Sequence, residues 1–135
     1  MSNAKNQTII FLLGGCLYGL IEVVARGYTH WSMFLTGGFV LTALYSINKV
    51  LHKRSILLRA LLGGCVITLA EFTVGCIVNL WLGMNVWDYS SQPFNLLGQI
   101  CLRFFLIWIF ICIPAYLLCD FLSVRLPEKD NYRNQ

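Results

Sequence analysis

Four long stretches of nearly unbroken apolar residues dominate the chain, with short polar segments between them. They cover about residues 8–25, 31–51, 56–82 and 95–122. A helix needs about 20 mostly apolar residues to cross the hydrocarbon core of a membrane. Each stretch meets this length within a few residues. The pattern therefore predicts an all-α, polytopic membrane protein with four transmembrane helices.

The composition supports this class and excludes others. Hydrophobic residues make up 58% of the chain and charged residues only 12%. A soluble domain has about 45–50% apolar and about 25% charged residues. So few charges cannot cover a water-exposed surface, which argues against a soluble enzyme, a disordered chain and a nucleic-acid binder. We therefore expect membrane lipid around the protein and no nucleic-acid partner.

The basic residues predict the orientation of the spans. Eight of the ten Lys and Arg residues lie before the first span, near the link between the second and third spans, or after the fourth: Lys5, Lys49, Lys53, Arg54, Arg59, Arg125, Lys129 and Arg133. Because cytoplasmic loops carry an excess of Lys and Arg, both termini should be cytoplasmic and the membrane should be the plasma membrane. We expect one membrane domain over residues 1–126 and a polar cytoplasmic tail over 127–135.

The two halves of the chain resemble each other. Leu-Leu-Gly-Gly-Cys occurs at residues 12–16 and again at 61–65, and Glu22 matches Glu71 at the same offset. Two spans per unit give a parallel repeat, with both units in the same orientation. Small residues four apart allow helices to approach closely. We therefore expect the first and third spans to face each other, with a close contact beside each carboxylate.

Glu22 and Glu71 are the most informative candidate site residues. A carboxylate inside a membrane is costly, and it is a functional candidate by default. Arg26 lies four residues after Glu22 and can pair with it on one helix face. Arg103, in the fourth span, could reach Glu71 if spans three and four are neighbours. Two interpretations stay open at this point: ion pairs that lock the bundle, or a substrate or proton site.

The outer link between the third and fourth spans supplies three further candidates. Asp88, Asn95 and Gln99 are polar residues in or beside this link, and Asn95 is placed to cap the fourth helix. The link is either an interfacial loop or a partly re-entrant segment over residues 86–94 that delivers polar groups to a cavity. In the second case these three residues form the outer mouth of a pathway. An outer aromatic belt is expected at Trp31, Trp81, Trp87 and Tyr89.

Motifs for catalysis or metal binding are not found in the sequence. The six cysteines lie inside apolar runs without C-x-x-C spacing, so zinc and disulfides are poor interpretations. The sequence also has neither an H-E-x-x-H motif nor a Ser/His/Asp arrangement. We expect no enzymatic activity, no metal and no cofactor.

The outer link also carries a family resemblance. Trp87 to Ser90, Pro93 to Leu102, and Trp108 form a pattern that resembles the signature of the ABC-transporter type IV (CmpB-like) family of small membrane proteins. The resemblance covers nearly the whole chain. It implies a transporter-like protein, but it supplies no substrate and no site residues. The chain has no phosphate-binding Gly-Lys-Ser/Thr loop, so an ABC system would need a separate ATPase chain.

These observations favour a transporter-like or permease-like protein of unknown substrate, with a Glu/Arg polar centre. The alternative is a non-transporting structural, lipid-interacting or regulatory membrane subunit. Four spans are few for a pathway. We therefore expect a homodimer or a larger membrane complex, in which two chains can line one pathway.

Overall fold

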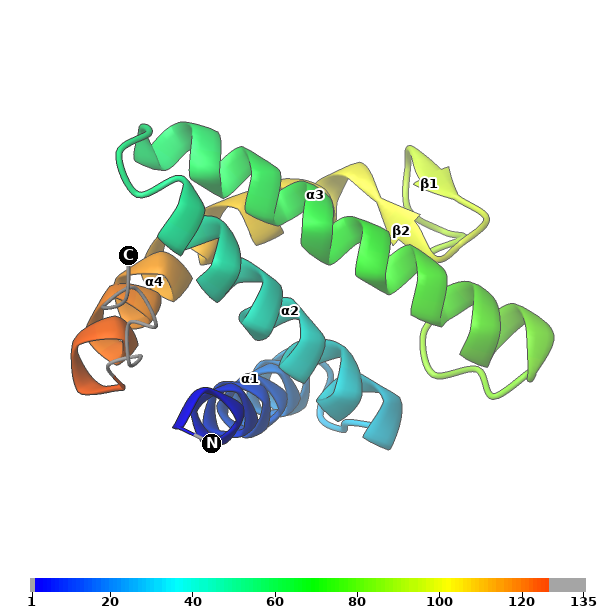
Figure 1. The fold of residues 1–135 in the computed structure, drawn as a ribbon. Helices are drawn as coiled ribbons and strands as arrows, with labels where there is room; N and C mark the ends of the chain where they lie inside the picture. Colours follow the sequence, from blue (N-terminus) through cyan, green and yellow to red (C-terminus); the bar gives the residue numbers. More distant parts are fainter. Residues whose placement is uncertain (1, 127–135) are drawn as a thin grey trace.

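The computed structural model describes residues 2–126, so the expected tail over 127–135 lies outside the described residues. The chain forms four long helices in sequence, with a π-helical turn and a small hairpin between the third and the fourth (Figure 1). The elements are α1 (Ser2–Arg26), α2 (Trp31–Val50), α3 (Ile56–Gly75), η1 (Cys76–Trp81), β1 (Asn95–Leu96), β2 (Ile100–Cys101) and α4 (Leu102–Arg125). The all-α class is confirmed.

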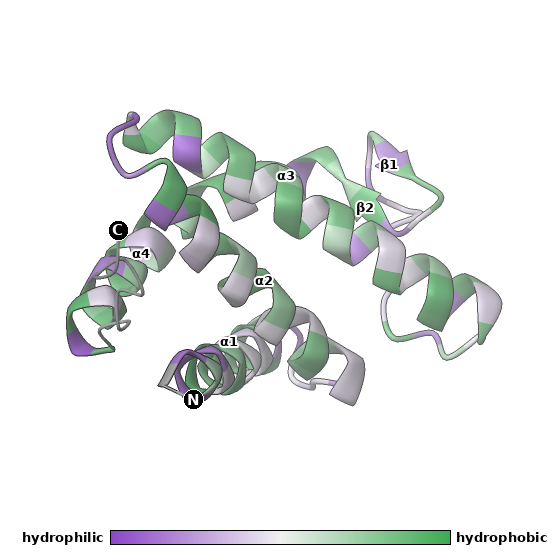
Figure 2. Ribbon diagram, in the orientation of Figure 1, coloured by the Kyte–Doolittle hydropathy of each residue, from purple (hydrophilic) through white to green (hydrophobic). Residues whose placement is uncertain are grey.

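The four helices are long and apolar enough to span a membrane, with η1 continuing the third span to Trp81. Figure 2 shows apolar colours along the helices and a polar link between α2 and α3. Many large apolar side chains stay exposed on the outer helix faces, among them Val24, Phe110 and Leu117. Such surfaces suit a lipid environment because water would not solvate them. The chain is an integral membrane protein.

Glycines let the helices pack in two hairpins, α1 on α2 and α3 on α4. A Cβ atom added at Gly14 would lie 2.6 Å from the Cβ of Leu41. A Cβ atom at Gly63 would lie 2.6 Å from the Sγ of Cys112. Both distances are too short for a side chain, so only glycine allows these approaches. Each glycine therefore brings its helix against the second helix of its own hairpin.

This arrangement corrects the expected contact between the first and third spans. In residues 2–126, α1 and α3 are not a closely packed pair. The small residues serve the contacts within each hairpin, which leaves no glycine seam between α1 and α3. Figure 1 shows α3 diverging from α2 after the link that joins them. The repeat itself remains a prediction, although Gly14 and Gly63 occupy equivalent positions in it.

The fourth helix begins at Leu102, later than the predicted start near Asn95. Residues 95–101 instead form an antiparallel hairpin, in which Asn95 pairs with Cys101 and Leu96 with Ile100. Positive φ angles at Phe94 (57°) and Leu97 (54°) interrupt any helix here, because a right-handed helix requires negative φ. This segment is as apolar as a transmembrane helix, but its backbone is not helical.

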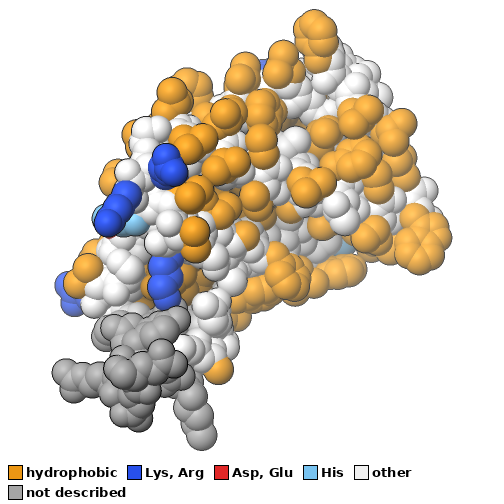
Figure 3. Space-filling view, turned by 45° about the horizontal axis from the view of Figure 1, so that its top comes forward, with side chains coloured by type: hydrophobic (Ala, Val, Ile, Leu, Met, Phe, Trp, Pro, Cys, Tyr) orange, Lys and Arg blue, Asp and Glu red, His pale blue; other side chains and the backbone are white. Residues whose placement is uncertain are grey.

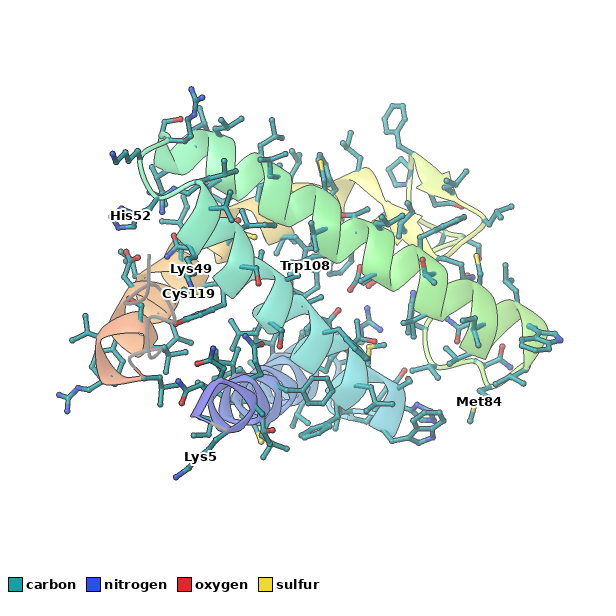
Figure 4. All side chains as sticks on the ribbon, viewed as in Figure 1. Lys5, Lys49, His52, Met84, Trp108 and Cys119 are labelled. Atoms are coloured by element: carbon teal, nitrogen blue, oxygen red, sulfur yellow. The ribbon has the colours of Figure 1, made fainter. Side chains whose placement is uncertain are left out.

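Both described chain ends and the α2–α3 link lie at the same end of the molecule. The side-chain amide of Asn6 donates to the carbonyl of Leu126 at 3.3 Å. His52 lies 4.0 Å from Asp120 near the end of α4. Figure 4 places Lys49 and His52 at this end and Met84 at the opposite end. On the face seen in Figure 3, most of the visible Lys and Arg side chains gather at one end and the remainder is largely apolar.

Candidate functional site

Glu71 of α3 lies where three helices meet. Its side chain is only 3% exposed. The hydroxyl of Tyr18, from α1, donates to one carboxylate oxygen. The indole N–H of Trp108, from α4, donates to the other oxygen at 3.1 Å. The Tyr18 and Trp108 rings stack with their centroids 5.3 Å apart, and Figure 4 shows Trp108 in the middle of the molecule.

Glu22 and Arg26 form a second part of the same polar cluster. Arg26 Nε lies 3.4 Å from Glu22 Oε2, one helical turn away, as the four-residue spacing allows. Glu22 is 5% exposed. The guanidinium also donates to the hydroxyl of Tyr89. It stacks over the rings of Trp87, Tyr89 and Phe104 at 5.2–6.0 Å, which adds cation–π attraction.

Arg103 does not join this cluster, so the expected Glu71–Arg103 pair is not formed. Arg103 is exposed at the start of α4. Trp108 occupies the face toward Glu71, and five residues separate the two positions by about 140° around the helix. The two oxygens of Glu71 already accept from Tyr18 and Trp108.

The described cluster contains two carboxyl groups and one guanidinium. Arg26 pairs with Glu22, whereas the hydrogen bonds that Glu71 accepts within the described residues come from the neutral groups of Tyr18 and Trp108. With both acids ionised, one buried negative charge would lack a cationic partner, which costs several kcal/mol. Uptake of a proton or a cation would remove this cost.

Of the three predicted mouth residues, only Gln99 lies inside the protein. It is 3% exposed, and its side-chain oxygen accepts from the amide of Asn79 at 2.8 Å. The indole of Trp87 donates to the Gln99 carbonyl at 2.9 Å, and the Asn79 oxygen accepts from the Val86 N–H at 2.7 Å. These bonds hold the 82–101 connection against η1. They form a structured cap rather than a row of polar groups along a pathway.

Asp88 and Asn95 lie on the outer surface of this cap and stabilise turns. The Asp88 carboxylate accepts from the backbone N–H of Ser90 at 2.8 Å, and this bond lowers the pKa of Asp88. Asn95 donates to the carbonyl of Gln92 at 2.8 Å and accepts from the Gly98 N–H at 3.0 Å. Asn95 therefore does not cap α4, whose N-cap residue is Cys101.

The sequence interpretation missed four residues of the cluster and its cap: Tyr18, Trp108, Tyr89 and Asn79. Tyr18, Glu22 and Arg26 recur every four residues on α1, and this spacing was a usable signal for Tyr18. Trp108 stood out only in the family pattern. Nothing local in the sequence places Tyr89 beside Arg26, because that contact depends on how the connection folds back.

Glu22 and Arg26 border a groove of about 430 Å³ between α1 and α4. The other lining side chains are apolar: Leu20, Ile21, Val24, Ala25, Phe104, Ile107, Trp108 and Ile111. A second hollow of about 230 Å³ shares Ile21, Trp108 and Ile111 with it, and extends past Gly14 and Pro114. The carboxylate of Glu71 lies behind Tyr18 and Trp108 and lines neither hollow. The cluster thus has an open edge at Glu22 and a closed interior at Glu71.

The fold and the site define a small four-span membrane protein with a buried cluster of polar side chains beside a lateral groove. The chain belongs to the family described as "Putative ABC-transporter type IV", which matches residues 9–129. No curated protein and no solved structure matches the chain.

Proposed function

We propose that the protein is a transporter-like or permease-like membrane protein that exchanges a proton for a cation at the Glu22–Glu71 cluster. The observation that carries this proposal is the composition of the buried cluster: it contains the carboxyl groups of Glu22 and Glu71 but only one guanidinium, which pairs with Glu22, and Glu22 also borders a groove. Intramembrane acids of this kind mark ion or proton pathways. A proton or a cationic substrate would neutralise the remaining negative charge, and exchange between the two gives coupled movement.

The contacts assign different roles to the two acids. Glu22 faces the groove, where a cation can approach it, and Arg26 limits its attraction for that cation. Glu71 is enclosed, and Tyr18 is placed to pass a proton between the Glu71 carboxylate and the second hollow, which Tyr18 lines. In this scheme Glu22 binds the substrate and Glu71 holds the proton. Neither step needs an enzymatic reaction.

The family assignment supports a part in an ABC system. Because the sequence lacks a phosphate-binding loop, this chain would be the membrane component and a separate chain would supply the ATPase. A homodimer or larger membrane complex would line a wider pathway than four spans can. We place the protein in the plasma membrane with both termini cytoplasmic, because most Lys and Arg residues precede the first span, flank the link between the second and third spans, or follow the fourth span.

The second candidate function is a non-transporting structural, lipid-interacting or regulatory subunit. The enclosure of Glu71 favours it, since both oxygens of that carboxylate already accept a hydrogen bond from a neighbouring helix. In that case the cluster fixes the angle between the hairpins and nothing passes through it.

Reconstituted liposomes with an entrapped pH-sensitive dye separate the two candidates. Tetraphenylphosphonium and ethidium gradients serve as the cation probes, and coupled proton movement is the readout. We expect proton movement in the wild type, a loss of at least about tenfold in Glu22→Gln with Glu71→Gln, and normal movement in the exposed control Arg103→Gln. An unchanged rate in the double variant rejects the carboxylate mechanism. No movement in any protein favours the non-transporting subunit.

A further inference from the structure

The two hollows along α1 and α4 are neighbours that share three lining residues, and together they are called the groove below. Along α1 their lining residues extend from Gly14 to Arg26. At a rise of 1.5 Å per residue this is a length of roughly 18 Å. Its walls are apolar over most of this length, and the charged side chains Glu22 and Arg26 line it only near the end of α1. A ligand that fits has an apolar chain and one polar end.

Arg26, which lines the polar end of the groove, has an unsatisfied donor. Arg26 Nη1 is buried and has no hydrogen-bond partner among the described residues, while Nε faces Glu22 and Nη2 donates to Tyr89. Buried polar groups are nearly always hydrogen-bonded. An unpaired guanidinium N–H therefore indicates a missing acceptor, and an anionic oxygen such as that of a phosphate is the strongest one.

This polar end lies at the depth of lipid head groups. Arg26 is the last residue of α1. Tyr28, which follows it, and Trp31, which begins α2, are large aromatic residues that are 51% and 60% exposed. Exposed Tyr and Trp side chains collect at membrane–water interfaces. A lipid with its head group at Arg26 would extend its acyl chain along the groove toward the membrane centre.

We infer that the groove is a binding site for phosphatidylethanolamine. The phosphate accepts from Arg26 Nη1, the ammonium donates to Glu22, and one acyl chain lies between α1 and α4. The Glu22 carboxyl group, which lines the polar end of the groove, disfavours a lipid whose head group is purely anionic. A choline head group has no N–H to donate to the Glu22 carboxylate. The site uses the same polar cluster as the proposed function but does not require transport.

Native mass spectrometry of the detergent-purified full chain tests the inference directly. The probes are phosphatidylethanolamine, phosphatidylcholine and phosphatidylglycerol with identical acyl chains, added at equal concentrations. We expect one phosphatidylethanolamine to remain bound about tenfold more tightly than the other two, as one charge-assisted hydrogen bond provides. Equal retention of all three lipids indicates nonspecific boundary lipid and overturns the inference.

Matched variants locate the site. Ala115→Phe fills the α1–α4 groove and should remove the bound lipid. Ala70→Phe fills the separate hollow between α2 and α3 and should leave it bound. Glu22→Gln should reduce the preference for ethanolamine over choline, whereas Arg103→Gln should not change it. If Ala115→Phe and Ala70→Phe behave alike, the site is not in this groove.

The outcome is independent of the flux assay. Selective lipid retention without proton-coupled movement supports the lipid site and rejects the transport proposal. Proton-coupled movement without lipid selectivity does the reverse. Thermal unfolding of each variant in the same detergent confirms that the comparison is made between folded proteins.

Discussion

At the residue scale, one carboxylate connects three helices. Glu71 accepts hydrogen bonds from Tyr18 of α1 and Trp108 of α4. Burial removes these groups from any alternative partner, so each bond is more costly to lose than a surface contact. The cluster therefore determines how the two hairpins are held together, whatever it binds.

Removing the Tyr18 hydroxyl should weaken the fold measurably. Tyr18→Phe leaves a buried carboxylate oxygen without its donor, and we expect a loss of about 1–3 kcal/mol in the free energy of unfolding. Denaturant unfolding in detergent micelles measures it. A double-mutant cycle with Glu71→Leu, which removes the acceptor, provides the control. Additive effects of the two substitutions would mean that the bond contributes nothing.

The hydrogen bond of Asp88 predicts a pH response in the connection over residues 82–101. Its pKa is lowered in the folded protein by the Ser90 N–H, so its stabilising effect is complete above the unfolded-state pKa of about 3.9. That effect is lost as pH falls through the lower folded-state pKa. We expect the fluorescence of nearby Trp87 to report a local opening in this acidic range. Asp88→Asn should lose this response, and an identical response in that variant would assign it to another group.

The local part of the site was predictable and the tertiary part was not. The Glu22–Arg26 pair follows from a four-residue spacing on one helix. The partners of Glu71 come from two other helices, whose rotation depends on packing at Gly14 and Gly63. Arg103 was misplaced for the same reason, since the sequence does not fix which face of α4 turns inward.

At the element scale, the close α1–α2 contact predicts different effects on stability for substitutions at two glycines of α1. Gly14 and Gly19 lie on the same helix, but a Cβ at Gly14 would meet Leu41 at 2.6 Å, whereas the nearest atom to a Cβ at Gly19 is 3.7 Å away in Thr29. Gly14→Ala should therefore destabilise the protein by about 1–3 kcal/mol through overpacking. Gly19→Ala should be neutral or slightly stabilising. Thermal unfolding in detergent compares them, and equal midpoints would refute the close α1–α2 contact.

The first three helices agree with the apolar pattern, and the fourth shows where that pattern fails. Hydropathy records how apolar a segment is, but not its φ angles. Hydropathy assigns three apolar residues to the fourth span: Leu96, Leu97 and Ile100. In the structure they belong to a hairpin, in which Leu97 has a left-handed backbone conformation. Asn95 has the residue type of a helix cap, but its side chain is used within a turn.

At the scale of the whole molecule, the orientation in the membrane is open to direct measurement. Ser55 precedes α3 and Ser91 lies in the outer connection, at opposite ends of the third span. We expect single cysteines at these positions to react with a membrane-impermeant maleimide from opposite sides, with position 55 cytoplasmic. The six native cysteines are free, so they must first be replaced. Labelling of both positions from one side would refute the four-span topology.

The close packing within each hairpin implies that the chain can be divided. The α1–α2 and α3–α4 pairs each contain their own glycine contact, and the link over residues 51–55 is short, polar and exposed. Two polypeptides cut in this link should insert separately and reassemble, with Tyr18 on one fragment recognising Glu71 on the other. Copurification of the two fragments would show that the separately inserted halves reassemble. Weaker copurification with Tyr18→Phe would show that the buried Tyr18 hydroxyl contributes to their specific association.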